Sequence, residues 1–235
     1  MDKCSFKTVI SVWDIMYLVC INQAKLMKGF VNMKTFIYMV RHGESPYDGN
    51  ERTRGLTKNG QLDAQKITDV LKSEGINTVI SSPYTRSILT VEPLAKQLKQ
   101  EVLVFEDLKE RIFSSEEKRV SDSELIPLLK KSFSDPNYAL YGGESNNDCQ
   151  KRSVNVLEEL LNTYKGQKVV IGTHALVMTL MMEHYNEMYN LDFLLQTTKP
   201  DIYKMEFNGR KLVEIKRMWE YSKVCEETYL HKWGR

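Results

Sequence analysis

Short apolar runs alternate with longer amphipathic stretches along the chain from residue 34 onward. The apolar runs are rich in β-branched residues, and we expect buried strands at residues 36–40, 78–80, 102–105 and 169–171. The amphipathic stretches carry apolar residues at helical spacing. They predict helices at residues 61–72, after Ser82-Pro83, at 147–164 and at 175–185.

Turn and cap signals add detail to this pattern. Thr57 is suited to cap the helix at 61–72, and Ser82 followed by Pro83 has the order of a helix cap and a first-turn proline. Asn208-Gly209 separates alternating stretches at 201–207 and 211–218, which predicts a β-hairpin. The repeated strand-to-helix steps predict an α/β fold with a mainly parallel central sheet and helices on both faces. The hairpin should add an antiparallel edge near the C-terminus.

The chain divides into an N-terminal extension at residues 1–32 and a single domain at 33–235. The apolar run at 9–21 contains Asp14 and is too short to cross a membrane. A signal peptide remains an alternative, although no A-x-A-like cleavage site follows. A mis-assigned start, with Met33 close to the true one, is the simpler hypothesis. Residues 112–141 are polar and irregular apart from a short helix expected at 124–133, which is typical of an insertion that serves as a lid.

Composition narrows the class of function. The chain has 235 residues and a net charge of +2, so we expect neither nucleic acid nor a membrane as a partner. Any anion must therefore be bound by local groups. The four cysteines lack the close spacing of a zinc or redox motif, and we expect free thiols in a reducing cytoplasm.

Candidate chemistry gathers where the expected strands end. The first strand runs into RHGES at 41–45, the second into SSPYTR at 81–86, and the last into GTHA at 172–175. Ligands of such sheets bind beyond the carboxyl ends of the strands. Guanidinium groups of Arg41 and Arg86 match phosphate oxygens and stay charged. A free imidazole titrates near pH ~6.5, so at cytoplasmic pH His42 can present a neutral ring nitrogen for attack on phosphorus.

These motifs, together with GGES at 142–145, resemble the histidine phosphatase superfamily in its phosphoglycerate mutase-like branch, over residues 33–182. The resemblance implies that His42 is the nucleophile and that Arg41, Arg86 and His174 form the phosphate pocket, with His174 also counted as catalytic. Glu110 resembles the proton donor of the family. An acid after a strand is also needed to protonate the leaving alkoxide, for which Asp107 is the alternative.

Further residues match the supporting positions of the family. Glu144 and Ser145, with Asp148 and Arg152 at matching offsets, resemble the segment that closes the pocket. The remaining supporting or substrate-binding candidates are Gly43, Ser45, Asp48 and Arg54.

The chain also departs from the family pattern. Asp48 stands where the family often has asparagine, and a carboxylate there would repel phosphate. Ala175 replaces a glycine, which we expect to have a minor effect. The tryptophan-containing stretch that follows the acid in mutase-type members is absent, and this weakens the hypothesis that the protein is a mutase.

Hydrolysis of a phosphate monoester, small or carried on a protein, is therefore the expected reaction. We expect it to need no cofactor and no metal. A mutase-like transfer and a phosphate-binding module without turnover are the alternatives, and a homo-oligomer stays open. In a purely structural reading, Arg86 would only pair with a neighbour such as Glu92.

Overall fold

The computed structural model describes residues 33–115 and 120–219. The extension at 1–32 with its apolar run lies outside these residues, as do Cys4, Cys20 and Cys225. In the described part of the chain, Cys149 is a buried free thiol. That part holds no helix with the length and apolar character needed to cross a bilayer.

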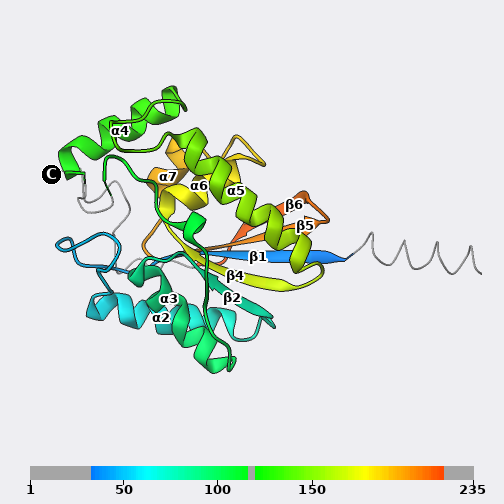
Figure 1. Ribbon diagram of the computed structural model, residues 1–235. Coiled ribbons are helices and arrows are strands. Elements are labelled where there is room, and N and C mark those ends of the chain that lie inside the picture. The colour runs from blue at the N-terminus through cyan, green and yellow to red at the C-terminus, as the bar shows by residue number, and fades with distance from the viewer. Residues whose placement is uncertain (1–32, 116–119, 220–235) are drawn as a thin grey trace, which may run out of the picture. The chain divides into compact units, whose positions relative to one another are not determined.

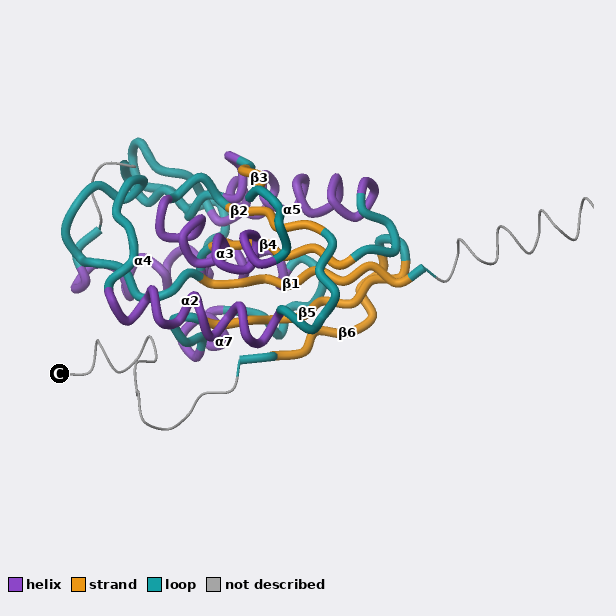
Figure 2. The backbone as a smooth tube through the Cα atoms, turned by 90° about the horizontal axis from the view of Figure 1, so that it is seen from below, coloured by secondary structure: helices purple, strands orange, loops and turns teal. Residues whose placement is uncertain are grey.

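The described strands form one sheet in the order β3-β2-β4-β1-β5-β6. Four of them are mutually parallel: β1 (Lys34–Arg41), β2 (Thr78–Ser81), β3 (Leu103–Val104) and β4 (Lys168–Thr173). The hairpin of β5 (Asp201–Asn208) and β6 (Lys211–Arg217) adds to β1 in the antiparallel direction. Figure 2 shows this order from one edge of the sheet to the other. The predicted α/β fold with an antiparallel C-terminal edge is thus confirmed.

Helices cover both faces of this sheet (Figure 1). One face carries α2 (Lys58–Leu71) and α3 (Thr85–Gln97). The other carries α5 (Asn146–Thr163) and α6 (Ala175–Glu183), with α4 (Asp122–Ser134) and α7 (Leu191–Gln196) beside them. A short 3-10 helix, η1, spans Glu106–Leu108 after β3.

Alternation along β1 explains the two layers of core. Ile37 and Met39 pack in the cluster with α5 and α6, whereas Tyr38 and Val40 pack in the cluster with α2 and α3. Successive side chains of a strand point to opposite faces, so a strand that is apolar at every position must be covered twice. The central strand is therefore buried on both sides, and its carboxyl end is held rigidly.

Several local expectations differ from the structure. Helix α3 begins at Thr85 with Tyr84 as its N-cap residue, so the expected cap at Ser82 is wrong. The Ser82 side chain instead contacts His174, with 2.7 Å between Oγ and Nε2. Strand β3 is shorter than the expected 102–105, and α7 had no counterpart in the pattern. Thr57 does cap α2, accepting a hydrogen bond from the Gly60 amide at 3.1 Å.

Candidate active site

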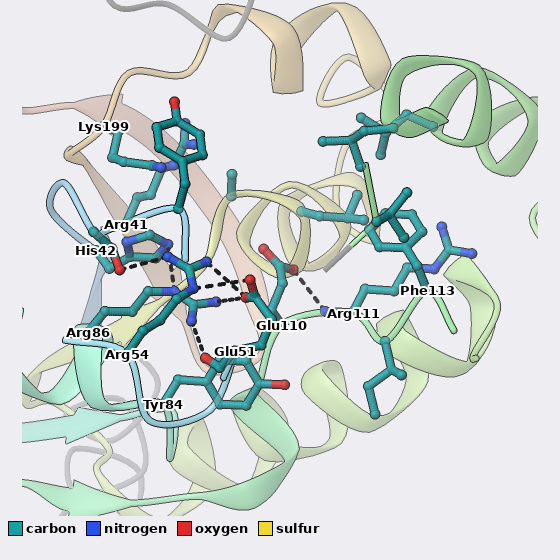
Figure 3. Close-up of a pocket in the computed structure, with 18 of the residues that line it drawn as sticks. Arg41, His42, Glu51, Arg54, Tyr84, Arg86, Glu110, Arg111, Phe113 and Lys199 are labelled. Atoms are coloured by element: carbon teal, nitrogen blue, oxygen red, sulfur yellow. Dashed lines mark hydrogen bonds and ion pairs between the residues drawn. The ribbon is translucent and has the colours of Figure 1, made fainter. Parts of the chain in front are cut away.

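A cavity of about 120 Å³ opens at the carboxyl ends of β1 and β2. Figure 3 shows His42, Arg86 and Glu110 directed toward it. His42 directly follows β1, and Arg86 lies in the first turn of α3. Residues that are distant in sequence meet here because the ends of neighbouring parallel strands share one edge of the sheet.

The hydrogen bonds of His42 define which ring nitrogen carries the proton. Its Nδ1 lies 2.8 Å from the carbonyl oxygen of Gly43, which can only accept, so Nδ1 is the donor. Arg86 Nε donates to His42 Nε2 at 3.1 Å, so Nε2 holds a lone pair. Burial lowers the pKa of His42 well below its usual value, and the charges of Arg86 and Lys199 lower it further. The ring is therefore neutral, and Nε2 is the nitrogen available for attack.

Gly43 allows the loop that carries His42 to lie close to helix α2. Its amide donates to Thr90 Oγ1 at 3.0 Å, while a Cβ at position 43 would lie 2.9 Å from the carbonyl oxygen of Gly60. Because that neighbour is backbone, a larger residue would displace the loop that carries His42.

Arg86 is the central cation of the cavity and is 1% exposed. Besides His42, it donates through Nη1 to the backbone oxygen of Glu51, and its Nη2 lies 3.2 Å from Glu51 Oε2. Glu92, the alternative partner, pairs instead with Lys96 at 3.0 Å. The structure thus directs the Arg86 guanidinium into the site rather than along the helix surface.

His174 lies directly behind Arg86 as the N-cap residue of α6, fully buried. Arg86 Nη2 is 3.4 Å from His174 Nδ1, and a guanidinium can only donate, so the proton of this imidazole is on Nε2. Nε2 then donates to Ser82 Oγ at 2.7 Å. The rings of His42 and His174 meet edge to face with centroids 5.3 Å apart. Burial lowers the pKa of His174 well below its usual value, with Arg86 as the next cause.

Arg41 is held by a loop that the sequence did not single out. Its Nη1 contacts Thr197 O at 3.1 Å, Thr197 Oγ1 at 2.9 Å and Thr198 O at 3.0 Å. The same loop places Lys199 in the lining of the cavity. Arg41 is 4% exposed, so its contacts with backbone oxygens fix the direction of the guanidinium.

An ion pair at the start of β5 fixes this loop in turn. Arg217 on β6 contacts both oxygens of Asp201, at 2.9 Å and 2.7 Å, and donates to Thr198 Oγ1 at 3.0 Å. Asp201 is fully buried and accepts from the Thr198 amide at 3.0 Å. Asp201 is also the β5 residue that pairs with Arg41 across the sheet. We call Asp201, Arg217 and Thr198 the strand-end clamp.

Glu110 follows η1 and lines the cavity, whereas Asp107 is exposed and does not. Arg111 N donates to Glu110 Oε1 at 2.8 Å. Burial raises the pKa of Glu110, against the opposing effects of that hydrogen bond and of Arg86 and Arg41. Of these two acidic candidates, Glu110 alone reaches the site.

The segment around Glu144 positions the Glu110 loop. Glu144 accepts from Ile112 N at 3.0 Å and pairs with Arg152 at 2.6 Å. Arg152 also donates to the backbone oxygens of Asp107 at 2.6 Å and Lys109 at 2.9 Å.

The neighbouring residue Ser145 begins helix α5. It forms a capping box with Asp148, in which each side chain bonds the backbone amide of the other residue at 3.1 Å. Neither Glu144 nor Ser145 lines the cavity, so both support it from outside.

The loop after His42 brings in two expected groups, Ser45 and Arg54, and one unexpected group, Glu51. Ser45 donates to Gly55 O at 2.6 Å and accepts from Arg54 Nη1 at 2.7 Å. Arg54 also binds both carboxylate oxygens of Glu51, at 3.0 Å and 2.8 Å. Asp48, in contrast, is exposed and is not among the described residues that line the cavity.

Glu51, Tyr84 and Lys199 line the cavity without having been predicted. A signal for Lys199 was present, because it lies two residues before an expected antiparallel strand. An antiparallel strand begins beside the carboxyl end of the strand with which it pairs, so residues just before it lie near the site. No comparable pattern marks Glu51, which lies in an irregular loop.

The fold and this arrangement of histidines and arginines define the class of protein. Residues 37–218 match the family model of the histidine phosphatase superfamily (branch 1), and the chain belongs to this family.

Among similar proteins, phosphoglycerate mutase-like protein 4 of Arabidopsis thaliana is 27% identical over 187 residues, 74% of this chain and 81% of the relative. A probable phosphoglycerate mutase of Photorhabdus laumondii, GpmB, is 29% identical over 60% of this chain and 70% of its own.

Solved structures share the fold. The mycobacterial glucosyl-3-phosphoglycerate phosphatase has a TM-score of 0.65 at 17% identity, covering 78% of this chain and 97% of that one. YhfR of Bacillus stearothermophilus has a TM-score of 0.65 at 22% identity, covering 76% and 94%. Family membership and these phosphatase and mutase-like neighbours support an enzyme of one of these two kinds.

Proposed function

We propose that the protein is a phosphatase that hydrolyses a phosphate monoester through a phosphohistidine on His42. The observation that carries this proposal is the lone pair on His42 Nε2, which faces Arg86 at 3.1 Å in a cavity that Glu110 also lines. A neutral nucleophile, fixed cations and a carboxyl group of raised pKa are the groups that phosphoryl transfer to histidine requires.

In the first step, His42 Nε2 attacks phosphorus and the bond from phosphorus to the leaving oxygen breaks. Glu110 donates its proton to that oxygen, and the alcohol leaves. In the second step, Glu110 takes a proton from water as the water oxygen attacks phosphorus. The nitrogen–phosphorus bond then breaks, which releases inorganic phosphate and restores neutral His42 and protonated Glu110.

Arg41 and Arg86 neutralise the transferred group. Both guanidinium groups are buried and fixed by hydrogen bonds, so little reorganisation is needed when charge spreads over the phosphoryl oxygens. We assign His174 the orientation of Arg86, because its Nδ1 accepts from that guanidinium. A direct hydrogen bond from His174 to phosphate would need the proton on Nδ1 instead.

Trapping by a rapid alkaline quench, in which phosphohistidine is stable, tests this proposal. Protein mixed with a ³²P-labelled monoester and quenched should carry an acid-labile label, and inorganic phosphate should be released. His42→Ala should abolish both, whereas His184→Ala should keep both, because His184 lies at the end of α6 beside Tyr185. Equal labelling of both variants would overturn the proposal. A protein that binds phosphate without labelling would be a binding module.

A phosphoglycerate mutase-like transfer is the second candidate, favoured by the names of the relatives. In that reaction the phosphoryl group on His42 would return to a bound hydroxy acid instead of water. Conversion of 3-phosphoglycerate to 2-phosphoglycerate without phosphate release would establish it in place of hydrolysis.

A further inference from the structure

The cavity has two ends of opposite chemistry. Near His42 the lining is cationic, with Arg41, Arg54, Arg86 and Lys199. The rest of the lining includes an apolar wall, which we define as Phe113, Leu125, Leu129 and Leu176. Figure 3 shows Phe113 across the cavity from His42. A monoester that places its phosphate on the cationic end must direct its leaving group away from His42, because attack and departure occur in line.

The apolar wall is part of the protein core rather than a loose surface patch. Leu125 and Leu129 are one turn apart on α4 and are 7% and 1% exposed, and Leu176 in the first turn of α6 is 3% exposed. All three belong to the core cluster against which Phe113 packs. The wall therefore exists before any ligand binds, and its shape is set by side chains that are packed on their other sides.

Arg111, the charged neighbour of this wall, has two guanidinium nitrogens bonded to other parts of the chain, while its Nη1 has no hydrogen-bond partner among the described residues. Arg111 donates through Nε to Glu144 O at 3.0 Å and through Nη2 to Tyr138 O at 3.2 Å, and its guanidinium lies 4.7 Å over the Phe113 ring. Figure 3 shows this side chain running away from His42. The four side chains of the wall carry no polar atoms, so a hydroxyl group pressed against them would lose water without gaining a partner, which is costly for each buried hydroxyl.

We infer that the leaving group of the substrate is a small apolar alcohol or phenol that packs against the apolar wall. This inference rests on the proposed phosphatase function and adds the substrate class. The whole cavity, including its cationic end, has a volume of about 120 Å³, so we expect the part that packs on the wall to be about one ring or a short branched chain, since an apolar cavity of ~150 Å³ holds one benzene.

Two esters of similar size, glycerol 1-phosphate and 3-methylbutyl phosphate, separate the effect of the apolar wall from the intrinsic reactivity of the leaving group. Glycerol is a better leaving group than 3-methylbutanol, so chemistry alone favours glycerol 1-phosphate. The inference predicts the reverse order in kcat/KM, by about tenfold or more, because each methylene buried is worth about fourfold. An equal or higher kcat/KM for glycerol 1-phosphate would overturn the inference while leaving the phosphatase function intact.

Matched variants on one helix locate the effect. Leu125→Ala should reduce the preference for 3-methylbutyl phosphate several-fold. The reduction should correspond to the free energy of burying those substrate carbons that lose contact with the Leu125 side chain. Leu128→Ala should leave that preference unchanged, because Leu128 lines a different groove with Pro127 and Leu140. Equal effects of the two variants would contradict the inference.

Failure of the proposed phosphatase function can be distinguished from failure of the inference about the leaving group. If 4-nitrophenyl phosphate and both esters are inert and no phosphohistidine forms, the phosphatase proposal fails. Calorimetric binding of 3-methylbutylphosphonate against 2,3-dihydroxypropylphosphonate then tests the wall without turnover. Tighter binding of the alkyl compound supports the inference, and equal or weaker binding overturns it.

Discussion

The guanidinium of Arg86 donates from Nε to His42 Nε2 at 3.1 Å, so the group that we propose to bind phosphate also holds the proposed nucleophile. This bond keeps the imidazole neutral and oriented while the site is without substrate. When a phosphoryl group arrives, its oxygens offer Arg86 better acceptors than a neutral nitrogen. The lone pair of Nε2 is then released at the moment when it is needed.

Arg86→Lys should therefore impair catalysis although it keeps the positive charge. An ammonium group lacks the fork that reaches His42, His174 and a phosphate oxygen at once. We expect a loss of about 10²–10³ in kcat/KM, the scale for removing one transition-state donor. Steady-state kinetics on a phosphate monoester measure it, with Arg210→Lys as the matched control on the exposed hairpin, where Arg210 pairs with Glu158. Losses below about threefold would contradict the role.

The pH dependence should follow His42 and Glu110 with opposite signs. The lowered pKa of His42 keeps the imidazole neutral when the pH falls below the usual pKa of histidine. Activity is therefore lost on the acid side only at a lower pH. The raised pKa of Glu110 keeps the acid protonated to higher pH, and activity falls as pH rises through that pKa. A profile of kcat/KM should therefore retain activity below the usual pKa of imidazole and fall on its alkaline side, and Glu110→Gln should remove that alkaline fall. An alkaline fall that Glu110→Gln leaves unchanged would contradict these assignments.

Glu110→Gln separates the acid from the rest of the site. Loss of the general acid should reduce turnover of an alkyl phosphate by about 10²–10⁴. The reduction should be much smaller for 4-nitrophenyl phosphate, whose leaving group needs little protonation. Asp107→Asn is the control, because Asp107 is exposed and outside the cavity. Similar losses for both substrates would indicate that Glu110 acts otherwise.

Glu51→Gln should strengthen phosphate binding. The carboxylate of Glu51 lies 3.2 Å from Arg86 Nη2 and 2.8 Å from Arg54 Nη2, so it competes with a phosphate for the same cations. Neutralising it should lower the inhibition constant of inorganic phosphate by about tenfold, equivalent to ~1.4 kcal/mol. Glu44→Gln, which alters an acid that does not line the cavity, should leave that constant unchanged. Weaker phosphate inhibition in Glu51→Gln would mean that Glu51 orders the arginines instead.

Arg217→Met should affect activity through Arg41, although Arg217 is not part of the cavity lining. Without Arg217 the strand-end clamp leaves Asp201 buried and unpaired, so the loop that holds Arg41 should shift. We expect a loss of kcat/KM of about tenfold to 10², and almost no further loss in an Arg41→Ala background, which a double-mutant cycle measures. Additive losses would show a general effect on stability, and thermal unfolding of each variant provides that control.

Much of the site could be predicted because its residues are local continuations of strands. The motifs at 41–45, 81–86 and 172–175 begin in the last residues of β1, β2 and β4 and continue beyond them, and parallel strands end at one edge. Asp48 shows the limit of this reasoning. Its match to a family position said nothing about direction, and the loop turns it toward solvent.

The sequence by itself determined the order of strands and helices along the chain apart from α7, the neighbouring pair Arg41 and His42, and the positions of Arg86 and His174 just after other strands. These features depend on short-range periodicity and on chain direction. Only the tertiary structure decided that Glu51 pairs with Arg86 and Arg54. It also decided that Asp201 and Arg217 hold the loop around Arg41. Those contacts arise where an irregular loop folds back and where β5 runs antiparallel to β1, and neither relationship is encoded in the spacing of neighbouring residues.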